Sequence, residues 1–257
     1  MTTMLFTPAH QAPVNPANKV PEITPAFWLI KLMAVTMGET AADYLNVNLG
    51  LGLTPTSILM SAILIGTLAI QFTRSTYIPW AYWLNVVLIS VVGTLLTDNL
   101  VDNMGVSLIT CTIAFSGLLG LTFWAWFRRE GTLSIHAVDT KPREAFYWLA
   151  ILFTFALGTA AGDLVAEQFA LGYLASGVLF GSVILSLFAG WLMLGLDAIL
   201  AFWLVYILTR PLGASFGDLL SQPVDYGGMG FGTILTSLMF LSVIVLTVVI
   251  MTLRREH

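Results

Sequence analysis

A pattern of three residues occurs four times in this chain: a tryptophan, a glycine ten residues later and an aspartate fifteen residues after the tryptophan. Successive copies start 55, 65 and 55 residues apart. A period of this length is typical of repeated supersecondary units. The chain is therefore expected to consist of four repeats, each with a carboxylate at the same place. The motif residues are Trp28, Gly38 and Asp43; Trp83, Gly93 and Asp98; Trp148, Gly158 and Asp163; and Trp203, Gly213 and Asp218.

The amino-acid composition is typical of a membrane protein. Of the 257 residues, 58% are hydrophobic and only 9% are charged, whereas a soluble domain carries about 25% charged residues. Each repeat contains two apolar segments of about twenty residues, the length of helix that spans a bilayer. We therefore predict an all-α integral membrane protein with eight transmembrane helices. Their expected ranges are 26–46, 56–73, 79–98, 105–127, 145–165, 172–193, 197–217 and 232–253.

The basic residues indicate how these helices are oriented. The loops at one end hold most of the lysines and arginines, and the opposite loops, near 47–55, 99–105, 166–171 and 218–231, hold none. Because basic loops stay in the cytoplasm, both termini are predicted to be cytoplasmic. The basic residues at that end are Lys19, Arg74, Arg128, Arg129, Lys141, Arg143, Arg254 and Arg255.

Two helices per repeat mean that all four repeats enter the membrane in the same direction. The predicted arrangement is parallel, with pseudo-symmetry about an axis along the membrane normal. The first helices of the repeats carry the motif and are expected to form a ring around a central site. The chain divides into a flexible tail (1–25), a first membrane half (26–127), a cytoplasmic loop (128–144) and a second membrane half (145–257).

The tryptophans and glycines of the motif are interpreted as structural. Each tryptophan of the set Trp28, Trp83, Trp148 and Trp203 lies near the cytoplasmic start of a helix, where indoles anchor proteins in the aromatic belt. Each glycine of the set Gly38, Gly93, Gly158 and Gly213 comes about 15 Å further along. A small residue there allows neighbouring helices to pack closely.

The carboxylates are the candidate functional groups. Asp43, Asp98, Asp163 and Asp218 are expected in the outer half of the membrane or at its edge. Three further acids lie four residues from a motif aspartate, on the same helix face: Glu39, Asp102 and Glu167. No lysine or arginine lies in the loops at this end, and crowded carboxylates in a low dielectric either bind a cation or take up protons. The alternative is that these acids are solvated and cap the outer helix ends.

Two basic residues are predicted inside helices. Lys31 is three residues after Trp28, from where its side chain can extend to the cytoplasmic surface. Arg210 lies deeper and precedes Pro211, so it is the better candidate for an internal ion pair with an acid of another repeat, or for a gate. Both residues break the equivalence of the repeats, as does Glu39, whose counterparts are Thr94, Thr159 and Ala214.

Several chemistries are not expected. Cys111 is the only cysteine, which excludes a disulfide framework or a thiolate metal site. The three histidines lie outside the predicted helices, so a haem is not expected. We predict no cofactor, no enzymatic activity and no nucleic-acid partner. The expected partners are the lipid bilayer, an inorganic cation and protons. Whether the chain also forms a homo-oligomer is left open.

Runs such as "GETAADYLNVNLGLGLTPTS", "VVGTLLTDNLVDNMG", "FYWLAILFTFALGTAAGDL" and "YILTRPLGASFGDLLSQP" carry a family likeness. From residue 19 to about residue 252, the chain resembles a bacterial family of uncharacterised "membrane-anchored" proteins. That family has four tandem two-helix repeats, each with a characteristic tryptophan. The resemblance implies the eight-helix architecture and the bacterial inner membrane, but no activity.

The leading functional hypothesis is a secondary transporter for an inorganic cation, coupled to protons. Oxygen ligands favour hard ions such as Mg²⁺, Ca²⁺ or Mn²⁺, and the four motif aspartates are the expected metal ligands. A non-transporting membrane scaffold or sensor is the alternative. An intramembrane enzyme is a third possibility, which requires one pair of acids to matter more than the others.

Overall fold

The computed structural model describes residues 16–255, and the first fifteen residues of the predicted tail lie outside this range. The described chain is all-helical, and its α-helices overlap the eight predicted ranges. They are α1 (Pro25–Asp43), α2 (Leu53–Thr73), α3 (Pro79–Asp98), α4 (Leu108–Glu130), α5 (Lys141–Asp163), α6 (Tyr173–Leu194), α7 (Ala198–Ser221) and α8 (Gly232–Arg255).

Local sequence accounts for where the helices begin and end. Side-chain oxygens cap the first turns of four helices, and prolines occupy the first turns of α1, α3 and α5, where no N–H donor is needed. Two helices end at glycines in the left-handed conformation, Gly131 after α4 and Gly195 after α6. The capping residues are Thr24, Ser107, Thr140 and Asp197.

Seven of the eight α-helices in the described part of the chain are long and apolar enough to cross a membrane. The protein is therefore a multi-pass membrane protein. The exception is α1, which carries Lys31, Glu39 and Asp43 within its 19 residues. These charges lower its apolar character, and one of them, Glu39, lies at the candidate site.

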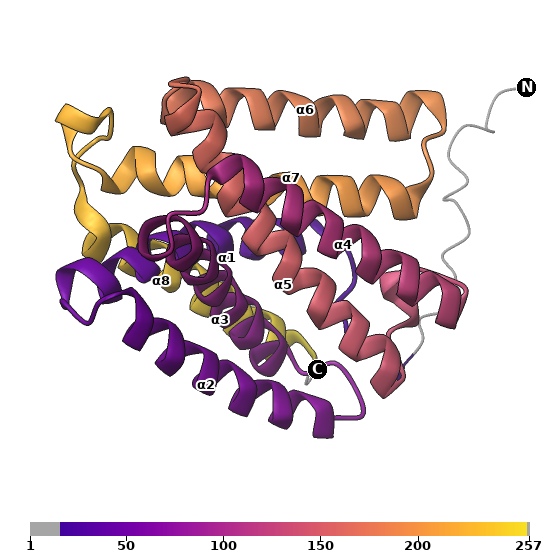
Figure 1. Cartoon of the computed structure of the whole chain (residues 1–257). Helices are drawn as coiled ribbons and strands as arrows, with labels where there is room; N and C mark the ends of the chain where they lie inside the picture. The colour runs from indigo at the N-terminus through magenta and orange to yellow at the C-terminus, as the bar shows by residue number, and fades with distance from the viewer. Residues whose placement is uncertain (1–15, 256–257) are drawn as a thin grey trace, which may run out of the picture.

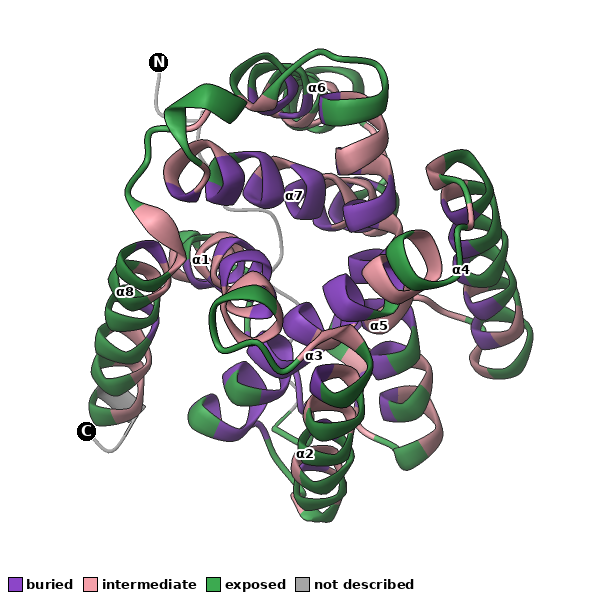
Figure 2. Ribbon diagram, turned by 60° about the vertical axis from the view of Figure 1, so that its left-hand side comes forward, coloured by how far each residue is buried: buried purple, intermediate pink, exposed green. Residues whose placement is uncertain are grey.

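The four odd-numbered helices form an inner ring. Helix α1 packs against α3 and α7, and α5 packs against the same two helices on the other side. The even-numbered helices lie outside, each against the first helix of the next repeat: α2 on α3, α4 on α5, α6 on α7 and α8 on α1 (Figure 1). Figure 2 shows buried residues concentrated on the inner helices and exposed residues on the outer ones.

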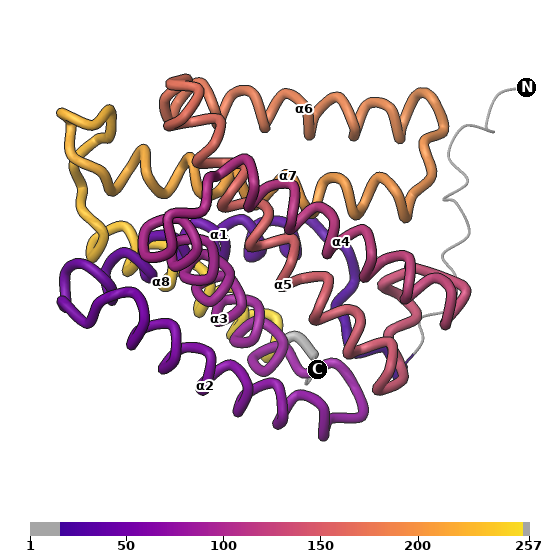
Figure 3. Tube along the Cα trace, viewed as in Figure 1, coloured from indigo at the N-terminus to yellow at the C-terminus, as the bar shows by residue number. Residues whose placement is uncertain are grey.

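Closure of the ring brings the two ends of the fold together. Helix α8 follows α7 in the chain and packs against α1 (Figure 3). The predicted ring of motif-bearing helices is therefore present. We call the end of the bundle where the odd helices start the tryptophan end, and the end where they finish the aspartate end.

The motif glycines are the points of closest approach around the ring. A Cβ at Gly38 would lie 2.0 Å from Oγ of Ser90, and one at Gly93 would lie 2.7 Å from Cβ of Phe155. The same type of contact recurs at the other two glycines, and each partner is the residue seven positions after the next tryptophan. A side chain at any of these positions would overlap a residue of the neighbouring inner helix, which is the close approach that the predicted packing role requires. The remaining pairs are Gly158 with Arg210 and Gly213 with Val35.

The predicted aromatic-belt role is wrong for three of the four tryptophans. Trp83, Trp148 and Trp203 are only 1%, 4% and 4% exposed, and they belong to the main hydrophobic core. The indoles pack between helices instead of against lipid, because the odd helices are enclosed by the outer ring. Trp28 is half-buried, and large aromatic residues that do face outward lie elsewhere, at Trp80 and Trp124.

Two predicted segment boundaries also change. The cytoplasmic loop predicted at 128–144 is shorter, because α4 continues to Glu130 and α5 begins at Lys141. The predicted tail 1–25 is not free at its described end, where Lys19 and Val20 are buried against the bundle. Specific bonds to α5 and to the loop before it hold this segment in place.

Candidate functional site

A π-helical segment follows the motif aspartate in each of the first three repeats. In these repeats Asp43, Asp98 and Asp163 are the last residues of their α-helices. The hydrogen bonds of the next turn span five residues instead of four, a feature that often marks functional sites. In the fourth repeat, α7 continues as an α-helix to Ser221. The π-helical segments are η1 (Tyr44–Asn48), η2 (Asn99–Asn103) and η4 (Leu164–Gln168).

Two of the three further acids predicted from the sequence lie in these π-helical turns. Asp102 lies in η2 and Glu167 in η4, and both are exposed, whereas Asp98 and Asp163 are half-buried. In these two repeats, the two acids of each expected pair therefore differ in exposure. Glu39 precedes Asp43 within α1 and is buried.

Three carboxylates from three different helices converge at the aspartate end of the ring. Oxygens of Glu39, Asp163 and Asp218 all lie within 4.8 Å of one another. Two oxygens bound to the same Ca²⁺ ion, at about 2.3–2.6 Å each, can be no farther apart than about this distance. The geometry of this acidic triad therefore suits a single hard cation.

The other two motif aspartates lie around this triad. Asp43 and Asp98 are half-buried, and their charges repel those of Asp218 and Asp163, respectively. The structure thus brings two of the four predicted ligands into one cluster with Glu39. The other two contribute negative charge nearby.

Arg210 is fully buried, with 0% of its surface exposed, and it reaches the triad from α7. Its Nη2 donates to Oε2 of Glu39 at 2.8 Å, and its Nη1 donates to the backbone oxygen of Val35 at 3.0 Å. The predicted ion pair between Arg210 and an acid of another repeat is therefore present. Pro211 does not end α7, which continues for a further ten residues.

The partners of Arg210 come from equivalent positions of the motif. Glu39, Thr94 and Thr159 each lie eleven residues after a motif tryptophan, and Nη2 of Arg210 lies within hydrogen-bonding distance of all three side chains. Thr94 also donates to Glu39 at 3.2 Å. One guanidinium therefore ties α1, α3 and α5 to α7, at a level where the repeats differ from one another in sequence.

Lys31 is buried inside the bundle, nearer to the tryptophan end than Arg210: it lies three residues after its motif tryptophan, and Arg210 lies seven after its own. It is fully buried, so it does not extend to the surface as the sequence suggested. Its ammonium donates to the backbone oxygen of Tyr206 at 2.9 Å and to the hydroxyl of Thr209, and it lies 4.1 Å from the centre of the Tyr206 ring. No carboxylate among the described residues lies within ion-pair distance of Lys31.

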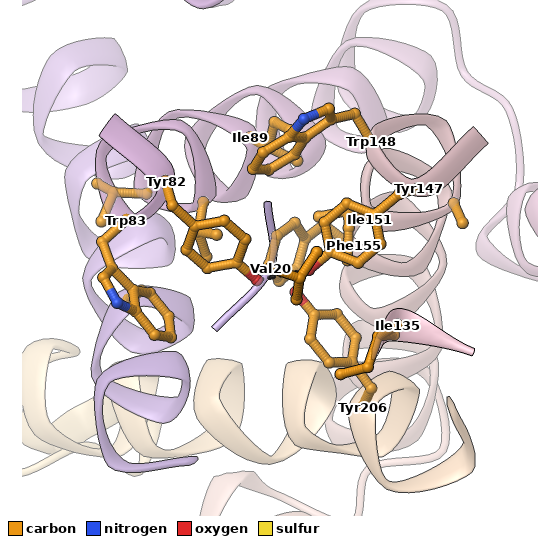
Figure 4. Packing of buried hydrophobic residues seen from close by; sticks show 14 of the residues in the cluster. Val20, Tyr82, Trp83, Ile89, Ile135, Tyr147, Trp148, Ile151, Phe155 and Tyr206 are labelled. Atoms are coloured by element: carbon orange, nitrogen blue, oxygen red, sulfur yellow. Dashed lines mark hydrogen bonds between the residues drawn. The ribbon is translucent and has the colours of Figure 1, made fainter. Parts of the chain in front are cut away.

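Three tyrosines fill the ring interior at the tryptophan end. Tyr82, Tyr147 and Tyr206 direct their hydroxyl groups toward one another and toward Val20 (Figure 4). Tyr82 and Tyr147 share a hydrogen bond, whereas the buried hydroxyl of Tyr206 has no partner in the described part of the chain. We call these three residues the tyrosine cluster.

Sequence reasoning missed the tyrosine cluster, although a signal was present. Tyr82 and Tyr147 directly precede two motif tryptophans, where the other repeats have Phe27 and Phe202. A hydroxyl added at equivalent positions of two inner helices indicates a polar contact across the ring. No comparable signal marks Tyr206 or Thr209 as partners of Lys31.

The fold and the site together define a multi-pass helical membrane protein, built from four two-helix repeats around buried charged residues. The chain belongs to the family described as Repeat of Unknown Function (DUF347), which matches it four times, at residues 26–77, 81–132, 146–195 and 201–257. Each match begins two residues before a motif tryptophan, so the four predicted repeats are confirmed. No curated protein and no solved structure matches the chain.

Proposed function

We propose that this protein is a secondary transporter that exchanges a hard inorganic cation, such as Mg²⁺, Ca²⁺ or Mn²⁺, for protons. The observation that carries the proposal is the acidic triad of Glu39, Asp163 and Asp218, whose oxygens lie within 4.8 Å of one another. Oxygen ligands in such a cluster suit hard ions. Acids placed inside a membrane protein usually serve transport or proton transfer.

The charge balance of the site supports a cation or protons as ligands. Five carboxylates lie at or next to the triad, and Arg210 is the one basic side chain among the described residues that forms an ion pair with any of them. The remaining negative charge is costly in a low dielectric unless a cation binds or protons are taken up. An exchanger uses this property, because cation and protons compete for the same oxygens.

Arg210 supports a mechanism in which an internal cation substitutes for the transported one. In the structure, Glu39 is bonded to the guanidinium. An incoming cation at the triad would compete with Arg210 for Glu39, and release of the guanidinium would loosen the contacts among α1, α3, α5 and α7. We propose that this change allows the two membrane halves to rock around the site.

The proposed orientation follows from the charges at the two ends of the bundle. We propose that all eight helices, α1 included, cross the bacterial inner membrane, with both termini in the cytoplasm. The basic loop residues at the tryptophan end support this topology. The recurring glycine contacts around the ring support pseudo-symmetry about the membrane normal.

The test uses purified protein in liposomes that contain a pH-sensitive dye, challenged in turn with Mg²⁺, Ca²⁺ and Mn²⁺. One of these cations should trigger a proton flux, and the double variant Asp163→Asn with Asp218→Asn should lose it. This variant keeps the partner of Arg210, so its fold should be retained. The matched control is Asp102→Asn with Glu167→Gln, two exposed acids at the same end, which should retain the flux.

Two results would contradict the proposal. Flux that persists in the double aspartate variant would show that the triad is not the transport site. Absence of flux with every cation, from protein that is demonstrably folded, would favour the alternative of a scaffold or sensor.

A further inference from the structure

The tryptophan end of the ring is closed by a short segment of the chain that precedes α1. The segment comprises residues 18–21, and Lys19, Val20 and Pro21 are buried. It covers the axis of the ring on the side opposite the acidic triad. Its contacts show how it is attached to the bundle.

Polar bonds attach this segment to α5 and to the loop before it. The ammonium of Lys19 donates to Oε2 of Glu144 at 2.6 Å, and both side chains are buried. Gln71 at the end of α2 donates to the other carboxylate oxygen of Glu144 at 3.2 Å. The backbone N–H of Lys19 donates to the carbonyl oxygen of Val138 at 2.9 Å. Glu144 is therefore the central acceptor of the attachment.

Val20 is the part of the segment that reaches the axis. It belongs to the same hydrophobic core as Tyr82, Tyr147 and Tyr206, and it lies in the middle of the tyrosine cluster in Figure 4. It is one apolar side chain, so little hydrophobic surface holds it in place compared with a packed helix.

The closed arrangement leaves polar groups unsatisfied. The hydroxyl of Tyr206 and the indole nitrogen of Trp148 are buried and have no hydrogen-bond partner among the described residues. The hydroxyl of Tyr206 lies next to Val20 in Figure 4, and valine cannot bond to it; an unsatisfied buried donor has a substantial free-energy cost. Water that enters when Val20 leaves would hydrogen-bond to this hydroxyl, which offsets part of the free-energy cost of opening.

We propose that residues 18–21 form the cytoplasmic gate of the transport path, with Val20 as the plug and the Lys19–Glu144 ion pair as the latch. This inference rests on the proposed exchange function, because exchange requires access to the triad from both sides of the membrane. At the aspartate end, Asp43, Asp98 and Asp163 are only half-buried. At the tryptophan end, the tyrosine cluster and Val20 close the axis.

The test measures how fast a thiol reagent that cannot cross membranes reacts from the cytoplasmic side. Cys111 is the only native cysteine, so a Cys111→Ala background allows single reporters to be introduced. Val20→Cys reports release of the segment. Ile151→Cys reports access to the axis, because Ile151 is fully buried in α5 at the position equivalent to Lys31.

Replacing Glu144 by Gln removes the charged acceptor and should raise the labelling rate of both reporters by about tenfold or more. The matched control is Glu130→Gln, because Glu130 also pairs with a basic residue at this end but has no bond to the segment. It should leave both rates unchanged. Cys111 itself, buried in α4, is retained in a further Glu144→Gln sample and should stay unreactive, which excludes general unfolding.

Two outcomes would overturn the gate. If Glu144→Gln changes neither rate, the segment is not held by this latch. If it accelerates labelling at Val20→Cys but not at Ile151→Cys, the segment moves without opening the axis. The experiment needs no transported ion, so a positive labelling result without flux in liposomes would reject the exchange function and not the movable segment.

Discussion

Gly158 provides the space through which Arg210 reaches the centre of the ring: a Cβ at residue 158 would lie 2.2 Å from Cγ of Arg210. The glycine belongs to the third repeat and the arginine to the fourth. The buried ion pair with Glu39 in the first repeat therefore depends on the absence of a side chain in the third.

Gly158→Ala should displace Arg210 and weaken its bonds to Glu39 and Thr159. Forcing a methyl group into a packed interior typically costs about 1–3 kcal/mol. The measurement is the unfolding midpoint of the purified protein in detergent. Gly66→Ala in α2 is the control, because a Cβ there has no neighbour within 4 Å. Equal midpoints for the two variants would show that Gly158 is not under this constraint.

Glu39→Gln should strongly destabilise the fold because it leaves the buried guanidinium of Arg210 without its anion. Loss of one partner of a buried ion pair costs about 3–5 kcal/mol. The double variant Glu39→Gln with Arg210→Gln should lose less stability than the sum of the single variants. A double-mutant cycle of unfolding free energies measures this coupling. Strict additivity would show that the pair contributes no coupling, and the exposed Glu22→Gln serves as the control.

Lys31→Met should not destabilise the fold, in contrast to Glu39→Gln. The ammonium of Lys31 is buried without a carboxylate partner, so its removal takes away a desolvated charge and leaves none behind. We expect the unfolding free energy to stay unchanged or to rise by about 1 kcal/mol. Arg210→Met leaves the carboxylate of Glu39 without its basic partner, so it should clearly lower the unfolding free energy under the same conditions. Comparable losses in both variants would show that Lys31 has a stabilising anion.

Trp203→Ala should disrupt the core of the bundle. Trp203 packs against Phe123 and Trp126, and its Nε1 donates to the carbonyl oxygen of Leu133 at 3.0 Å. Truncation of a buried tryptophan typically costs about 3–5 kcal/mol. Trp80→Ala is the control, since Trp80 is 49% exposed and should have a small effect in detergent. A small effect at Trp203 would restore the aromatic-belt interpretation.

The sequence was most informative where one local rule determines the outcome. Pro79 sets the start of α3, which runs over the predicted residues 79–98. The motif glycines recur at helix contacts because only glycine permits the approach observed there. Arg210 was predicted to pair with an acid of another repeat, because a buried guanidinium needs an anion.

Other features depend on how elements pack, which sequence spacing does not report. Asp102 and Glu167 follow aspartates by four residues, yet π-helical turns place them in exposed positions. The residues next to Trp83 in the sequence would be the same whether its side chain faced lipid or the interior of the bundle. Its burial depends on where the outer helices pack. Lys19, the neighbour of Val20, pairs with Glu144, which lies 125 positions away in the chain.

The central claim is that the acidic triad of Glu39, Asp163 and Asp218 binds a hard cation. The most direct measurement is calorimetric titration of the purified protein at neutral pH with Mg²⁺, Ca²⁺ and Mn²⁺ in turn. We predict that at least one of these ions binds once per chain, and that Asp163→Asn with Asp218→Asn abolishes this binding while Asp102→Asn with Glu167→Gln retains it. Failure of all three ions to bind the folded protein, or binding that survives loss of both triad aspartates, would contradict the claim.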